Sequence, residues 1–129
     1  MPQPDLSRVP EWYHRYINQV SEIDLNEAIR NQTNDFISFL ASLPADKIEY
    51  RYADDKWTIK EVLQHIIDTE RIFAYRALCF ARKDTTPLPG FDENSYADNS
   101  KASGRDWNEM LEEFKVVRQS TAILFKSFD

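Results

Sequence analysis

The chain has 129 residues, two glycines, one cysteine and a formal net charge of −6, which together suit one domain with a buried core. So few glycines argue against a β-rich fold, and a lone cysteine excludes a disulfide within the chain. An acidic chain repels phosphates, so we expect no nucleic-acid partner. No apolar stretch is long enough to cross a bilayer, so we expect no membrane partner either. The sequence therefore predicts a single all-α, cytoplasmic domain over 1–129.

Two helices are predicted in the first third of the chain. Pro10 suits the first turn of a short helix over 11–20. Proline has no backbone N–H, and in the first turn of a helix that N–H would have no partner in any case. Asp24 is a good N-cap for a helix that runs over 25–43 with apolar residues at three-four spacing. Pro44 then ends this second helix.

The next predicted helix has the clearest start signal in the chain. Thr58 and Glu61 have the spacing of a capping box, and Trp57 precedes the cap, where it can pack on Val62. A wide apolar face continues to about Arg82.

Residues 83–104 are predicted to be a long loop, which lets two neighbouring helices run in the same direction. A last helix should begin near Ser103 or Gly104, with Asp106 in its first turn. No glycine, proline or basic cap ends it, so we expect further residues beyond Asp129. Three long amphipathic helices and one short helix predict a helix bundle.

His65 is the candidate for chemistry. At about 100° per residue, one polar stripe of the helix holds Glu61, His65, Asp68, Thr69, Ile72 and Arg76. Neutral imidazole binds zinc, nickel or iron well, and a nearby carboxylate can hold its tautomer. His65 is therefore a possible metal ligand. Asp68 could accept a hydrogen bond from its imidazole, and Glu61 is a weaker candidate for this role because it is part of the cap. The alternative is an idle histidine on a solvated face.

The other reactive residue types point to structural roles. His14, beside Trp12 and Tyr16, suits a partly exposed packing position, and Cys79 lies too far along the helix to share a site with His65. Three arginines in the second half of the same helix suit either an anionic substrate or ordinary surface pairing, namely Arg71, Arg76 and Arg82. No phosphate-binding loop or dinucleotide fingerprint is present.

The run over 57–78 resembles the DinB-like superfamily of metal-dependent enzymes, and 87–93 and 113–121 are similar to further parts of its pattern. The resemblance implies a four-helix bundle, usually a homodimer, that holds one divalent metal, zinc or nickel, through three histidines. The first histidine matches His65, and the other two come from a final helix that this chain lacks. Better-known relatives are thiol-dependent transferases and isomerases.

The resemblance therefore predicts a C-terminally truncated bundle whose metal site is incomplete and whose apolar faces are left open in a groove. The implied function is that of a divalent-metal-dependent enzyme, a thiol-dependent S-transferase or a hydrolase acting on a small molecule. The alternative is a non-catalytic helical interaction module, a dimerising stress-response protein, in which the groove binds a partner helix.

Overall fold

The computed structural model of the protein describes residues 4–20 and 24–128, and every regular element in these ranges is helical. The α-helices are α1 (Glu11–Ile17), α2 (Leu25–Ala41), α3 (Ile59–Ala81), α4 (Glu93–Asn99) and α5 (Trp107–Lys126). Short 3₁₀ turns lie at Leu6–Arg8, Ala45–Lys47 and Ala102–Gly104. The predicted all-α fold class is confirmed.

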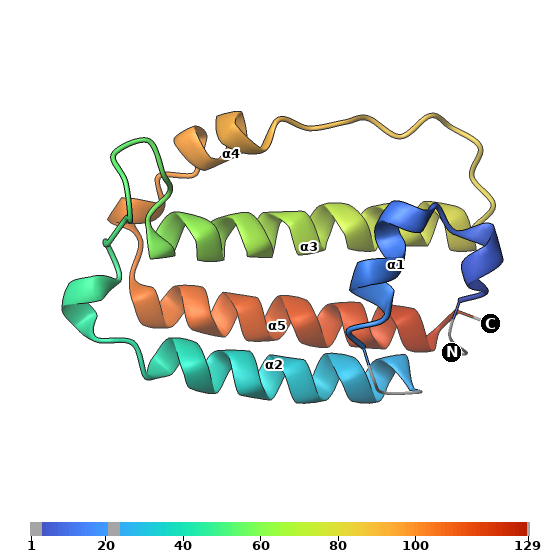
Figure 1. Ribbon diagram of the computed structural model, residues 1–129, viewed down its shortest axis with the longest axis horizontal. Helices are drawn as coiled ribbons and strands as arrows, with labels where there is room; N and C mark the ends of the chain where they lie inside the picture. Colours follow the sequence, from blue (N-terminus) through green and yellow to red (C-terminus); the bar gives the residue numbers. More distant parts are fainter. Residues whose placement is uncertain (1–3, 21–23, 129) are drawn as a thin grey trace.

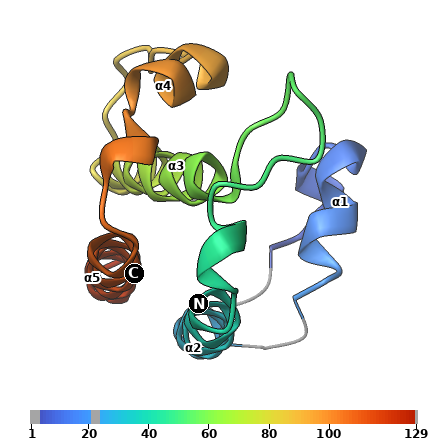
Figure 2. The ribbon, with the colours of Figure 1, turned by 90° about the vertical axis from the view of Figure 1, so that its left-hand side faces the viewer.

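Helix α5 is the centre of the bundle, because α2 and α3 both pack on it and contact each other far less. It runs in the same direction as α3 and antiparallel to α2, so the parallel neighbours expected from the long connection are present (Figure 1). Viewed end-on, α4 lies on the outer side of α3, and α1 lies on the side of the bundle opposite α5 (Figure 2).

The core lies where the apolar faces of the three long helices meet. Leu63 and Ile67 of α3 and Met110 of α5 are fully enclosed, and burial of such side chains contributes about 1.5–3 kcal/mol each. Leu40 of α2 and Phe114 of α5 extend the same cluster. The predicted apolar stripes therefore form the core.

The predicted N-caps are observed. The Asp24 carboxylate accepts a hydrogen bond from the Glu27 N–H at 2.9 Å at the start of α2. The Thr58 hydroxyl accepts from the Glu61 N–H, and the Glu61 carboxylate accepts from the Thr58 N–H, which completes the capping box.

Two predictions for the second half of the chain are wrong. The supposed loop over 83–104 contains α4, which is started by the Asp92 side chain, and a 3₁₀ turn at Ala102–Gly104. Asp106 is not in the first turn of α5 but caps it, since its carboxylate accepts from the Glu109 N–H. A competing cap two or three residues later therefore moved the helix start.

Helix ends were also predicted too far along the chain. Helix α1 ends at Ile17 rather than residue 20, and α2 ends at Ala41 rather than residue 43. Helix α5 does end, at Lys126, where the Ser127 N–H donates back to the Leu124 carbonyl. Each of these ends is a tightened final turn, which needs no glycine or proline signal.

The expected open groove lies between α2 and α3, which both pack on α5 more than on each other. It has a volume of about 210 Å³, and all of its lining residues are apolar: Phe36, Phe39, Leu40, Leu43, Ile59, Val62, Leu63 and Ile66. Phe39 and Val62 remain exposed at its rim. Within the described residues, no helix is both long enough and apolar enough to cross a membrane.

Candidate functional site on helix α3

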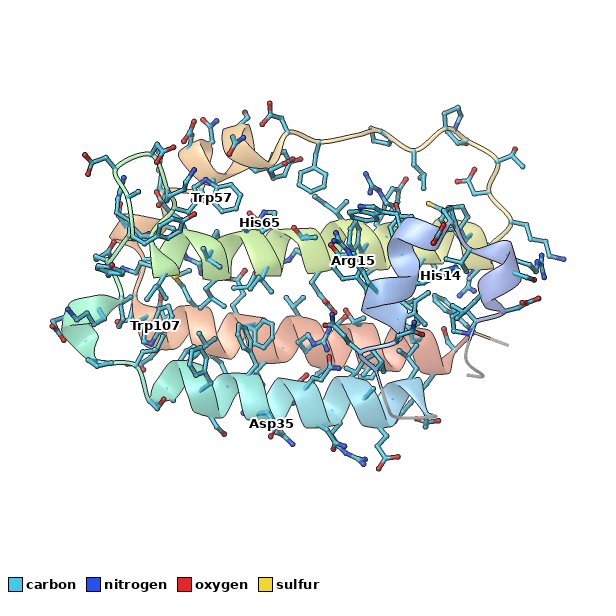
Figure 3. All side chains as sticks on the ribbon, in the orientation of Figure 1. His14, Arg15, Asp35, Trp57, His65 and Trp107 are labelled. Carbon is cyan, nitrogen blue, oxygen red and sulfur yellow. The ribbon has the colours of Figure 1, made fainter. Side chains whose placement is uncertain are left out.

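His65 lies in the first half of α3, close to the helix start that the capping box fixes. Its ring packs against that of Trp57, with the two centroids 4.8 Å apart and the planes inclined at 45°. Figure 3 shows the two rings together on the edge of α3, far from His14. His65 is half-buried rather than turned freely into solvent.

Neither carboxylate predicted to support His65 does so. Glu61 is engaged in the capping box, where its Oε2 accepts from the Thr58 N–H at 2.7 Å. Asp68 accepts from the Gln64 side-chain amide at 3.0 Å. Among the described residues, no hydrogen bond reaches either ring nitrogen of His65, and the contact that its ring does make is with Trp57.

Thr69 adds a second unsatisfied polar group on this face of α3, one turn beyond His65. Its Oγ1 is buried and has no hydrogen-bond partner within residues 4–20 and 24–128. A buried hydroxyl without a partner costs about 1–3 kcal/mol, so such groups tend to mark functional positions. His65 and Thr69 together leave polar atoms unpaired on one side of the helix.

A polar network braces the neighbouring face of α3 against α5. Buried Gln64 accepts from Arg105, and Arg105 also pairs with Glu113 at 2.6 Å. Arg71 reaches the other oxygen of Glu113 at 2.7 Å. Burial raises the pKa of Glu113, but hydrogen bonds from Arg105 and then Arg71 outweigh it, and the net pKa is lowered.

A second ion pair crosses the interior farther along the bundle. Arg118 of α5 donates to both carboxylate oxygens of Glu70 of α3, at 2.9 and 3.1 Å. The same guanidinium donates through Nε to the Thr33 hydroxyl of α2. One half-buried arginine thus links the three long helices.

Two hollows of about 290 and 320 Å³ lie between α3 and the segment that carries α4, and Tyr96 lines both. Asp68 lines one of them, and Arg71 and Arg76 line the other. Arg76 donates to the Pro89 carbonyl and stands 5.9 Å from the Phe91 ring centre. Arg71 therefore pairs with a carboxylate of α5, as the surface-pairing interpretation predicts, whereas Arg76 holds the covering segment through a carbonyl and a ring.

The remaining candidates stay apart from His65. His14 is half-buried, with Nε2 at 2.8 Å from the Val9 carbonyl oxygen and 3.0 Å from that of Leu6, so it holds the N-terminal turn. Cys79 is buried at the far end of α3, in agreement with the packing role predicted for it.

The residues present do not make a complete metal site. A mononuclear catalytic zinc site needs three protein ligands, and His65 supplies one. Across residues 4–20 and 24–128, no three His, Cys, Asp or Glu side chains come together in a way that could hold a metal ion.

Three residues of this region have no distinguishing pattern in the sequence. Gln64, Arg105 and Glu113 are ordinary surface types in sequence, and their network depends on the approach of the α5 entry to α3. Thr33 and Arg118 did leave a trace, because each interrupts an otherwise apolar helical stripe.

The geometry defines a class of protein: an open helical bundle with an apolar groove between α2 and α3 and a half-buried histidine on α3. The family model of the DinB superfamily matches residues 28–129, so the chain belongs to the DinB superfamily. No curated protein and no solved structure matches it.

Proposed function

We propose that this protein is a divalent-metal-dependent enzyme in which His65 supplies one metal ligand. The observation that carries the proposal is the half-buried imidazole with no hydrogen bond to any described residue, one turn from the buried, unpaired Thr69 hydroxyl. Membership of the DinB superfamily supports it, and zinc or nickel fits an imidazole donor. The proposed reaction class is thiol S-transfer or hydrolysis of a small molecule.

The proposal requires ligands from outside the described residues, because His65 alone does not complete a site. A second copy of the chain is one source, which would make the expected homodimer part of the site. Trp57 would set the direction of the imidazole through its ring contact.

The test is the metal content of the natural protein and of two single variants. His65→Ala should lose about one equivalent of metal per chain, the amount expected for a mononuclear site. His14→Ala is the matched control, because His14 is also half-buried on a helix but lies against two carbonyl groups. Equal metal content in the wild type and His65→Ala would rule the proposal out.

A specific observation favours a second candidate, a non-catalytic helical interaction module. The apolar groove between α2 and α3 is open, and Phe39 and Val62 are 56% and 41% exposed at its rim. Large apolar groups left in water in this way are typical of interaction surfaces. In this case Phe39→Ser should abolish association measured by light scattering, while the protein is metal-free with or without His65.

A further inference from the structure

A second groove lies between α2 and α5, on a part of the bundle that the His65 site does not use. It has a volume of about 390 Å³, within the range of small-molecule sites. Ile29 of α2 and Ala122 and Ile123 of α5 give it an apolar lining. Figure 1 shows the two helices side by side and antiparallel along this length.

The charged side chains that line this groove all have the same sign. They are Arg30 of α2 and Lys115, Arg118 and Lys126 of α5, and no aspartate or glutamate lines it. The whole chain carries 22 acidic and 16 basic residues, so this local excess runs against the net charge of −6. A cleft with one sign of charge and apolar walls concentrates ions of the opposite sign.

Two of these cations are already partly neutralised. Arg118 is bound to Glu70 and serves as part of the floor, where its Nε also meets Thr33. Lys115 lies 3.6 Å from Glu112, but both side chains are exposed, so this pair is weak.

Of the other two cations, Arg30 is the one with no carboxylate neighbour among the described residues. No described carboxylate lies within ion-pair distance of Arg30, although it stands beside the apolar lining. The pKa of Asp24 is lowered, chiefly by the hydrogen bond from the Glu27 N–H and, to a lesser extent, by Lys126. Lys126 therefore lies near one carboxylate, whereas Arg30 is the natural anchor for an anion from solution; both line the groove.

We propose that the groove between α2 and α5 binds a small amphipathic anion, an aliphatic carboxylate whose head pairs with Arg30 and Lys126. Its tail would lie over Ile29, Ala122 and Ile123. A nucleic acid or an anionic membrane is disfavoured, because either would bring many phosphates against a chain whose net charge is −6. The site is independent of His65 and of any metal.

Titration calorimetry with decanoate, below its micelle concentration, tests the proposal, with decanol as the uncharged comparison. Decanoate should bind about tenfold more tightly than decanol, which corresponds to the roughly 1.4 kcal/mol of one good charged contact. The double variant Arg30→Gln/Lys126→Gln should lose this preference and leave decanol binding unchanged.

The matched control is Arg82→Gln/Lys47→Gln, which removes the same two kinds of charge from exposed positions outside the groove. It should bind decanoate as the wild type does. The proposal is overturned if decanol binds as tightly as decanoate, or if both double variants weaken decanoate equally. Unchanged circular dichroism in both variants ensures that the comparison reports on binding.

Discussion

The ring of Trp57, the residue before the N-cap of α3, lies against the ring of His65, two turns farther along the helix, at a centroid distance of 4.8 Å. The sequence predicts packing of Trp57 on Val62, and the ring contact with His65 is one that it did not predict. The observed contact connects the helix start to the candidate ligand. The residue next to the capping box of α3 therefore contacts the imidazole.

Replacement of Trp57 tests this connection. Trp57→Ala should lower the free energy of unfolding by about 1–3 kcal/mol, since it removes a half-buried ring and a ring pair worth about 0.5–1.5 kcal/mol. Trp57→Phe keeps an aromatic face and should lose less than half as much in urea unfolding. Equal losses in the two variants would show that the ring contact contributes little.

The capping box should behave as one unit. Thr58→Ala and Glu61→Ala each remove one of two reciprocal hydrogen bonds and should each cost about 1 kcal/mol. The double variant should cost less than the sum, with a coupling of about 0.5 kcal/mol or more. Strict additivity in thermal unfolding would mean that Glu61 is free for another role, such as supporting a metal.

Removal of only one partner of the ion pair between Glu70 and Arg118 should lower the free energy of unfolding. Arg118→Met leaves a half-buried carboxylate and should destabilise the protein by about 2–3 kcal/mol. Glu70→Met/Arg118→Met removes both charges and should recover most of that loss in urea unfolding. A double variant no more stable than the single one would show that Arg118 acts mainly through Thr33 and packing.

Thr69→Val should stabilise the metal-free protein. The substitution replaces a buried, unpaired hydroxyl with a methyl group of similar size, so the free energy of unfolding should rise by about 1 kcal/mol. Thr33→Val is the matched control and should destabilise, because the Thr33 hydroxyl accepts from Arg118 and donates to the Ile29 carbonyl. Loss of stability in Thr69→Val would indicate that its hydroxyl has a partner in solution.

Glu113 should contribute to acid sensitivity. Its pKa is lowered in the folded state by Arg105 and Arg71, against the opposing effect of burial, so the folded state favours the ionised carboxylate. The stabilisation is complete above the unfolded pKa of about 4.3 and is lost as the pH falls through the lower folded pKa. Urea unfolding of Glu113→Gln should therefore show a smaller loss of stability below about pH 4 than the wild type.

Local signals in the sequence were enough for the helices that carry the site. The caps at Asp24 and Thr58 act within four residues, and the apolar stripes of α2, α3 and α5 follow directly from helical spacing. Helix α4 was missed because it has only seven residues, and its two less polar residues, Tyr96 and Ala97, are too few to show a helical period.

The contacts around the candidate site could not be predicted from such local signals. The pairing of Gln64 with Arg105 joins residues 41 positions apart, and the same Gln64 side chain donates to Asp68. The sequence placed His65 beside two carboxylates on a helical wheel. Only three-dimensional packing shows that each carboxylate already has another partner.

The most direct test is an experiment on the imidazoles of His65 and His14 in the natural protein. Long-range ¹H–¹⁵N NMR spectra recorded while Zn²⁺ is added report on the ring nitrogens of each. If His65 is a metal ligand, the signals of its ring nitrogens should change with stoichiometric metal, while those of His14, held against the Val9 and Leu6 carbonyls, should not. Unchanged His65 signals, with or without changes at His14, would contradict that role.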